Sequence, residues 1–332
     1  MIALRPYQQE AIDQTYAYWT DGKGEHPLIV APTGSGKSLI LGQIVKDVCD
    51  WGGRVLMLTH VKELIEQNAA ELKLLMPEAD IGIYSAGLNK KQLDHQVVFG
   101  GIQSIWQRAF DMVPAPDVVI IDEAHMLPKK TTTRYGSFIK DIAVANRDVK
   151  IIGLTATPYR LDSGLLYKGA GAIFDGISYD IPVLDLIAQG YLAPVISKGG
   201  ENKIDLSNVH KRGGEYIESE LATAASDPEL VKSVVAEICE VGAYRKSWLI
   251  FASGVGHAEM LAEEFAANGI ECGIVTGDTH KGDRATLIGR FKSRDLRCLI
   301  NINVLTTGFN APCTDLVALV RATMSTSLYV QM

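Results

Sequence analysis

Residues 28–38 read Leu-Ile-Val-Ala-Pro-Thr-Gly-Ser-Gly-Lys-Ser, a run of apolar residues followed directly by a glycine-rich turn. A helical pattern over residues 38–49 follows, and strand, turn and helix in this order are the context that a P-loop requires. Glycines let backbone N–H groups face phosphate oxygens, and the N-terminus of the helix adds a partial positive charge. The strict pattern begins with Gly where this chain has Ala31. We expect Lys37 to reach the β- and γ-phosphates of a nucleotide and Ser38 to bind Mg²⁺.

Short apolar runs alternate with helical patterns along the rest of the chain, which favours an α/β fold with parallel sheets. The run Val-Val-Ile-Ile at 118–121 is apolar on both faces, as a sheet covered by helices on each side requires. The predicted strands are 28–31, 54–59, 81–84, 97–100, 118–122, 151–155, 248–252, 273–276, 298–302 and 316–320. The predicted helices are 38–49, 61–75, 102–110, 256–268 and 284–291.

The chain of 332 residues is long enough for two domains of roughly 100–200 residues each. The stretch 158–181 is rich in Gly and Tyr and has no clear period, so we place the connection between domains there. Residues 198–215 are polar and rich in Gly, and we interpret them as a loop. We therefore predict an N-terminal ATP-binding domain at 1–175 and a C-terminal domain at 176–332.

Composition excludes several classes of protein. Hydrophobic residues make up 47% and charged residues 21%, as in ordinary globular proteins, and no run of about 18 apolar residues predicts a membrane-spanning helix. The charged residues Arg5, Glu10 and Asp13 argue against a secretory signal. The net charge of −7 does not by itself indicate a nucleic-acid partner, but binding needs only a local basic surface.

The five cysteines are scattered, odd in number and form no Cys-x-x-Cys pair. This pattern argues against a disulfide framework or a zinc site and favours a reducing cytoplasm.

Two carboxylates follow the apolar run at 118–121, in the sequence Asp122-Glu123-Ala124-His125. Ligands of open α/β sheets bind at the C-terminal ends of the strands, where this pair is expected to lie. Asp122 can hold Mg²⁺, Glu123 can orient and deprotonate an attacking water, and His125 can form a hydrogen bond to another motif.

Further short motifs stand in a fixed order around these two. They are Arg5-Pro6-Tyr7-Gln8, Leu58-Thr59-His60-Val61-Lys62-Glu63-Leu64, Gly101-Ile102-Gln103-Ser104, Thr155-Ala156-Thr157-Pro158, Leu249-Ile250-Phe251-Ala252, Thr276-Gly277-Asp278 and Asn303-Val304-Leu305-Thr306-Thr307-Gly308-Phe309-Asn310-Ala311-Pro312. Together they resemble the ordered motifs of superfamily 2 helicases with an Asp-Glu-Ala-His (DEAH) box. The start Leu4-Arg5-Pro6-Tyr7-Gln8-Gln9 and the strings at 60–64 and 305–309 are most similar to the bacterial and phage RadD-type DNA repair helicases.

The resemblance implies two RecA-like parallel-sheet domains in tandem with a nucleotide cleft between them, and ATP and Mg²⁺ as cofactors. It implies catalytic roles for Lys37, Asp122, Glu123 and His125, and metal binding by Ser38 and Asp122. The implied nucleotide-binding residues are Arg5, Tyr7, Gln8, Thr33, Gly34, Ser35, Gly36, Lys37, Ser38, Gly308 and Asn310. Gln8 would read the adenine edge, with Arg5 or Tyr7 packing on the base. Position 310 is commonly Asp in the family.

The resemblance also implies contacts with the nucleic-acid backbone from both domains. The implied residues are Thr59, His60, Gln103 and Ser104 in the first and Thr276, Gly277, Thr306 and Thr307 in the second. Hydroxyl and N–H contacts to phosphate carry no sequence information, so such a protein can move on strands of any sequence. Thr155 and Thr157 would couple nucleotide state to nucleic-acid binding.

The implied activity is an ATP-dependent DNA helicase or translocase in DNA repair or recombination, acting on single-stranded or branched DNA without a membrane partner. Two alternatives stay open: an RNA-stimulated ATPase or helicase, and a non-hydrolysing, ATP-gated DNA-binding module. The family's last motif, Gln-x-x-Gly-Arg-x-x-Arg, begins at Gln331, one residue before Met332. An arginine finger is worth about 10³–10⁵ in rate. We therefore expect the sequence as given to be impaired in hydrolysis and the arginines to lie in a longer chain.

Overall fold

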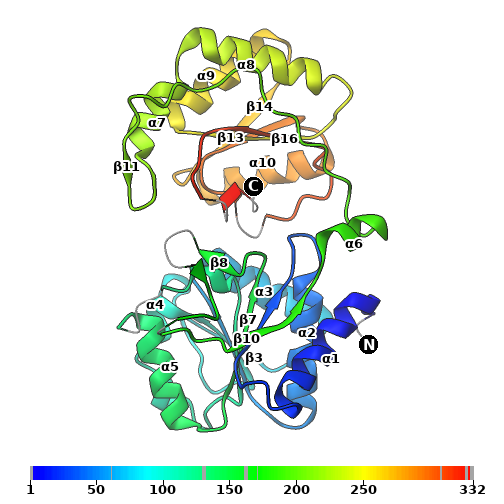
Figure 1. Ribbon diagram of the computed structural model, residues 1–332, viewed down its shortest axis with the longest axis vertical. Coiled ribbons are helices and arrows are strands. Elements are labelled where there is room, and N and C mark those ends of the chain that lie inside the picture. Colours follow the sequence, from blue (N-terminus) through cyan, green and yellow to red (C-terminus); the bar gives the residue numbers. More distant parts are fainter. Residues whose placement is uncertain are drawn as a thin grey trace. The chain divides into compact units, whose positions relative to one another are not determined.

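The chain folds into two compact units, Met1–Pro194 and Val195–Met332, in a computed structural model (Figure 1). The structure describes residues 3–60, 62–128, 132–160, 164–169, 171–306, 309–325 and 328–329. Each unit is a largely parallel β-sheet with helices on both faces, which confirms the predicted α/β class. The first unit extends to Pro194, beyond the boundary at 175/176 that the sequence analysis placed.

The sheet of the first unit has the strand order β10-β1-β7-β6-β2-β5-β3-β4. Every strand pair is parallel except β3 with β4, so the C-terminal ends of β1, β7, β6, β2 and β5 lie at one end of the sheet. The strands are β1 (Pro27–Val30), β2 (Val55–Thr59), β3 (Ile81–Ser85), β4 (Lys90–Lys91), β5 (Val97–Gly101), β6 (Val118–Ile121), β7 (Lys150–Thr155) and β10 (Gly176–Asp180). Two further short strands, β8 (Tyr159–Arg160) and β9 (Gly164–Leu165), form a separate antiparallel pair.

Two apolar clusters hold this sheet between its helices. One cluster joins alternate strand residues such as Phe99 to α1 (Pro6–Thr20), α2 (Lys37–Asp50) and α3 (Lys62–Leu75). The other joins the intervening residues, such as Val98, to α4 (Ile102–Ile105) and α5 (Arg134–Ala145). The helix α2 buries Ile40, Leu41, Ile44, Val45 and Val48, the spacing of a stripe along one side of a helix. Short elements complete the unit: α6 (Val183–Ala188) and the 3₁₀ turns η1 (Ala86–Leu88), η2 (Ala109–Asp111) and η3 (Ala124–Met126).

Two predictions for this unit are wrong. The helix expected over 102–110 stops at Ile105, where Arg108 N bonds to Ile105 O in a tighter turn, and the chain resumes as η2. The stretch 158–181, expected as a connection, contains the strand β10, which pairs with β1. Because β10 has a neighbour on one side only, its residues are half-buried or exposed and lack the apolar run of a central strand.

The second unit has a smaller sheet with the order β14-β15-β13-β16, in which all pairs are parallel. Its strands are β13 (Trp248–Ala252), β14 (Cys272–Val275), β15 (Cys298–Asn301) and β16 (Leu316–Val320). Helices α8 (Pro228–Val241) and α9 (Val255–Ala267) pack on one face, α10 (Lys281–Ser293) packs on the other, and α7 (Glu218–Ala225) precedes α8. Residues 198–215 are not all loop, because Lys211–Arg212 (β11) and Glu215–Tyr216 (β12) form a hairpin.

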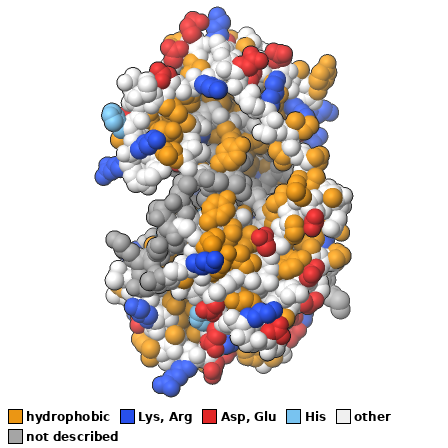
Figure 2. Space-filling model, in the orientation of Figure 1, with side chains coloured by type: hydrophobic (Ala, Val, Ile, Leu, Met, Phe, Trp, Pro, Cys, Tyr) orange, Lys and Arg blue, Asp and Glu red, His pale blue; other side chains and the backbone are white. Residues whose placement is uncertain are grey.

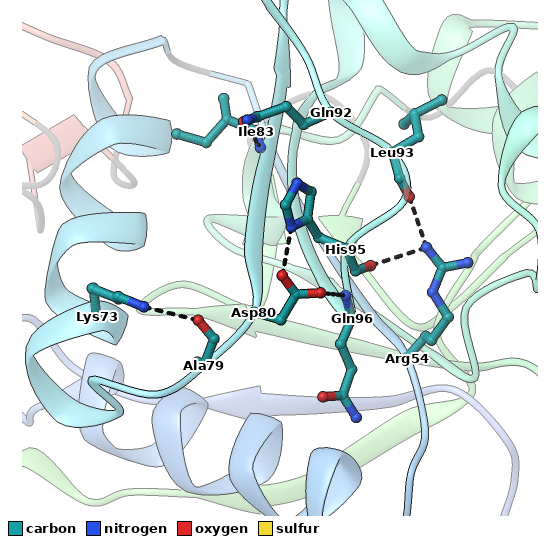
Figure 3. A network of polar contacts seen from close by, with 9 residues as sticks. All are labelled: Arg54, Lys73, Ala79, Asp80, Ile83, Gln92, Leu93, His95 and Gln96. Atoms are coloured by element: carbon teal, nitrogen blue, oxygen red, sulfur yellow. Dashed lines mark hydrogen bonds and ion pairs between the residues drawn. The ribbon is translucent and has the colours of Figure 1, made fainter.

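A polar network ties together the N-terminal ends of the strands in the first unit (Figure 3). The guanidinium of Arg54, just before β2, donates to the carbonyl oxygens of Leu93 at 2.7 Å and His95 at 2.9 Å. Asp80, just before β3, bonds His95 Nδ1 at 2.6 Å and accepts from the N–H of Gln96 at 2.9 Å. This network fixes the chain that leads into β5, at the end of the sheet opposite the P-loop.

Among the residues that the structure describes, no helix is both long enough and apolar enough to cross a membrane.

Candidate functional site

The P-loop joins β1 to α2 by a turn that needs glycine at two positions. Gly34 and Gly36 have φ of 81° and 78°, in the left-handed region that glycine adopts without steric cost. A Cβ atom added at Gly36 would lie 2.5 Å from Gln8 Nε2. Lys37 begins α2, and its Nζ donates to Ala31 O across the loop at 3.4 Å. Thr33, Gly34 and Ser38 are exposed, so the loop presents its backbone and the Ser38 hydroxyl to solvent.

The start of α1 supports this loop from behind. Ser35 O accepts hydrogen bonds from Tyr7 OH and from Gln8 Nε2, both at 2.8 Å. Gln8 Oε1 accepts from the N–H of Arg5 at 2.9 Å. Tyr7 is 7% exposed and Gln8 1%, so both side chains are committed to contacts inside the protein. The geometry therefore makes Gln8 a brace of the P-loop, and its reading of the adenine edge stays a prediction.

A half-buried aromatic beside the exposed Arg5 was not found by the sequence analysis. The guanidinium carbon of Arg5 lies 4.5 Å from the centre of the Tyr191 ring, and that ring lies 5.3 Å from the ring of Tyr7. Tyr191 is half-buried and follows α6, far from any motif. No sequence signal marks it, since only the fold brings residues 5, 7 and 191 together.

The acidic pair follows β6 and is held by its surroundings. Asp122 Oδ1 accepts from the N–H of Glu123 at 2.9 Å, and Asp122 Oδ2 accepts from Asn68 Nδ2 on α3 at 3.0 Å. Asn68 was not predicted as a site residue, because it lies on a helix after the 58–64 motif. Its contact fixes the orientation of a carboxylate that is expected to bind metal.

Glu123, the second carboxylate of the pair, is half-buried, with 13% of its side chain exposed. Burial raises its pKa, the Lys37 cation opposes this shift and the Asp122 carboxylate reinforces it, so the pKa lies above its ordinary value. Its Oε2 is buried and forms no hydrogen bond with any residue that the structure describes. A buried carboxylate oxygen with acceptor capacity to spare is the chemistry expected of a general base that positions a water.

His125 and the threonines after β7 join the ends of two neighbouring strands. His125 Nδ1 lies 3.0 Å from Thr155 Oγ1, which also bonds the N–H and the carbonyl of Thr157 at 3.0 Å each. The same His125 atom lies 3.4 Å from Glu123 Oε2. The acidic pair and the 155–158 segment are therefore connected through His125 and one threonine hydroxyl group.

The predicted nucleic-acid residues of the first unit lie at the ends of β2 and β5. Thr59 is buried, whereas His60 is exposed. The His60 ring stacks on the Tyr135 ring, with 6.1 Å between the ring centres. Gln103 is exposed and accepts a hydrogen bond from Arg134, and Ser104 Oγ accepts from the N–H of Ala86 at 2.9 Å.

In the second unit, the predicted residues lie in loops after β14 and β15. Arg284 on α10 donates to the carbonyl oxygens of Thr276 at 3.0 Å and Gly277 at 3.1 Å, which fixes the first loop. Thr306 is half-buried and Asn310 is exposed. Thr307, Gly308 and Gln331 lie outside the residues that the structure describes.

No group of three or more His, Cys, Asp or Glu side chains that could hold a metal occurs among the described residues. The donors near the P-loop are instead single hard oxygens, the exposed hydroxyl of Ser38 and the carboxylate of Asp122. Such a set suits Mg²⁺, which is usually held by one or two protein oxygens together with substrate phosphates and water.

Two protein families match the sequence in succession. Residues 1–160 match the family described as Type III restriction enzyme, res subunit, and residues 231–332 match the family described as Helicase conserved C-terminal domain. IRC3 of Saccharomyces cerevisiae, whose name assigns it to the ATP-dependent helicases, is 27% identical over 341 residues, which are 99% of this chain and 48% of that protein. The chain thus spans about half the length of this curated relative.

Solved structures share the fold. The helicase Lhr of Mycobacterium smegmatis, bound to single-stranded DNA and AMP-PNP, aligns with a TM-score of 0.61 at 17% identity over 96% of this chain and 43% of its own. Dbp5 of Saccharomyces cerevisiae, bound to RNA and ADP-BeF3, aligns with a TM-score of 0.56 at 15% identity over 99% of this chain and 83% of its own. These likenesses confirm the prediction of two RecA-like domains in tandem.

Proposed function

We propose that this chain is a superfamily 2 helicase that couples ATP hydrolysis to movement on DNA. The two successive family matches and the 27% identity to IRC3 support this proposal. One observation carries the proposal. The P-loop follows β1, the segment 155–158 follows β7 and the acidic pair follows β6, and these three strands are neighbours in the sheet. Phosphate-binding, relay and acidic groups therefore converge at the C-terminal ends of adjacent strands, where α/β proteins bind nucleotides.

Each group has a role that its geometry supports. Amides of residues 33–37 and the Lys37 ammonium bind the β- and γ-phosphates, with the loop braced by Tyr7 and Gln8. Ser38 and Asp122 would hold Mg²⁺, which neutralises phosphate charge when bound. Glu123 accepts the proton of the attacking water, and the Arg5–Tyr191 pair offers an exposed surface for the base.

The nucleic-acid contact is proposed on the exposed polar groups of both units. His60, Gln103 and the loops that contain Thr276 and Thr306 lie after strand ends and present donors suited to a sugar–phosphate backbone. DNA in single-stranded or branched form is the proposed substrate, and a RadD-type, DEAH-box role in repair or recombination is the finer proposal. The five cysteines are free thiols, which supports the proposed cytoplasmic location.

The test compares two lysines of the same helix. Lys37→Ala should abolish binding of a fluorescent ATP analogue and nucleic-acid-stimulated hydrolysis. Lys46→Ala should behave as wild type, because Lys46 pairs with the exposed Asp50 on its own helix. Normal hydrolysis by the Lys37→Ala protein would refute the assignment of the site.

The same assay, run with single-stranded DNA, branched DNA and RNA, distinguishes the substrates. Stimulation by RNA alone would replace the DNA proposal with an RNA-dependent ATPase. Nucleotide-dependent DNA binding without turnover would favour the non-hydrolysing alternative.

A further inference from the structure

A short hairpin precedes α7 in the second unit. Lys211 pairs with Tyr216 and Arg212 with Glu215 in antiparallel register, and the turn between them is Gly213-Gly214. The two glycines have φ of 63° and 87°, which the two-residue turns of tight hairpins require. The turn thus places the consecutive residues Lys211 and Arg212 at the tip of the element labelled β11 in Figure 1, where their side chains leave opposite faces of the strand.

Among the residues that the structure describes, no carboxylate forms an ion pair with either cation at this tip. Lys211 and Arg212 are both exposed. Lys211 Nζ lies 5.6 Å from the centre of the Tyr216 ring. Figure 2 shows Lys and Arg side chains projecting over the place where Figure 1 labels β11. In a chain with a net charge of −7, this tip is a local basic surface.

The acid within the hairpin is turned inward. Glu215 accepts hydrogen bonds from Thr323 Oγ1 at 2.6 Å and from the backbone N–H groups of Met324 at 2.9 Å and Ser325 at 3.2 Å. Burial opposes ionisation of Glu215, but these hydrogen bonds outweigh it and hold its pKa below the ordinary value. The carboxylate is therefore charged at neutral pH, satisfied by its donors and unable to neutralise the cations at the tip.

A second carboxylate positions the adjoining helix. Glu218, at the start of α7, accepts from Asn303 Nδ2 at 2.8 Å. Asn303 follows β15, and the segment held by Glu215 follows β16. The hairpin is thus fixed at the C-terminal ends of the strands, the same end of the sheet that carries Thr276 and Thr306.

We propose that the hairpin 211–216 is a nucleic-acid contact of the second unit, in which Lys211 and Arg212 pair with the phosphates of the bound strand. The inference rests on the proposed function and adds to it a site that belongs to none of the motifs. Because both contacts are ionic and go to the backbone, the hairpin binds strands of any sequence, and its share of the affinity falls with salt.

The test measures binding of a fluorescent oligothymidylate to the whole chain over a series of NaCl concentrations. Loss of two phosphate contacts reduces the slope of log K against log [salt] by about 1.4 for single-stranded DNA. Lys211→Ala with Arg212→Ala should show this reduction together with affinity about tenfold weaker at low salt. Lys211→Arg with Arg212→Lys keeps both charges and should retain the wild-type slope.

The matched control removes another adjacent pair of exposed cations, Arg245 and Lys246, which lie just before β13 at the opposite end of the strands. Arg245→Ala with Lys246→Ala should leave the slope unchanged. An unchanged slope in the Lys211/Arg212 double variant, or an equal reduction in the control, would overturn the hairpin contact. Absence of oligothymidylate binding by the wild-type chain would instead count against the proposed function.

Discussion

Replacement of Gln8 by Ala separates two roles that this residue could have. In the structure its amide joins the N–H of Arg5 to the carbonyl of Ser35, so it braces the P-loop. If Gln8 braces the loop, its loss weakens the binding of every nucleotide that uses the loop. If Gln8 reads the adenine edge, its loss weakens the binding of ATP alone.

The expected loss of stability follows from the contacts. Two hydrogen bonds of a side chain that is 1% exposed disappear, and at about 1 kcal/mol each they contribute about 2 kcal/mol. Ser35 O keeps its bond to Tyr7 OH, so the loop is loosened but not released. We expect the free energy of unfolding to fall by about 2–3 kcal/mol and nucleotide affinity by about fivefold, which corresponds to about 1 kcal/mol.

Urea denaturation gives the stability, and titration with fluorescent ATP and GTP gives the two affinities. The Gln8→Ala protein should lose affinity for both nucleotides by the same factor. Gln9→Ala is the matched control, because Gln9 bonds only the exposed Asp13 on its own helix. Unchanged stability combined with a loss confined to ATP would refute the brace and restore the adenine-reading role.

Three further substitutions test neighbouring contacts. Asn68→Ala frees the Asp122 carboxylate and should raise the Mg²⁺ concentration needed for tight ATP binding by about threefold to tenfold, with no effect on binding in EDTA. Thr155→Val removes the hydroxyl that joins two strand ends and should lower stability by about 1–3 kcal/mol and weaken stimulation of the ATPase by DNA. Asp80→Asn should lower the free energy of unfolding by less than about 1 kcal/mol at pH 7, because the ion pair with His95 is largely exposed. The His95 contact lowers the pKa of Asp80 below 3.8, so its stabilisation is present above that pH and is lost as the pH falls through the lowered pKa.

Each of these has a control and a contradicting outcome. Gln67→Ala is the control for Asn68, because the Gln67 side chain bonds Glu71 on its own helix, and it should leave the Mg²⁺ dependence unchanged. An equal effect of both substitutions would contradict the role of Asn68. Thr155→Ser keeps the hydroxyl and should restore coupling to DNA. A difference between wild type and Asp80→Asn that does not shrink as the pH falls below the ordinary range of an aspartate would show that ionisation of Asp80 is not its source.

Sequence patterns predicted the parts of the fold that depend on residues adjacent in the chain. The central strands 118–121 and 248–252 are continuous apolar runs, and the P-loop is a contiguous motif whose glycines have the expected left-handed conformation. The edge strand β10 was not predicted, because half of its environment is solvent and its residues alternate in polarity.

Contacts between distant segments could not be predicted in the same way. Tyr191 meets Arg5 and Asn68 meets Asp122 only because the sheet places their elements together. Gln8 was predicted as a site residue, but its hydrogen-bond partners were not. They depend on how closely α1 approaches Ser35, and this distance cannot be predicted from the spacing of residues in the sequence.

The pairing of β10 with β1 has a consequence for any isolated nucleotide-binding fragment. β1 leads into the P-loop and has β7 on one side and residues 176–180 on the other. A polypeptide that stopped at Asp175 would expose the backbone amides and carbonyls along one flank of β1, and such an unpaired flank recruits other chains. A soluble ATP-binding piece of this protein should therefore be cut after Pro194, and a shorter one should aggregate before its nucleotide affinity can be measured.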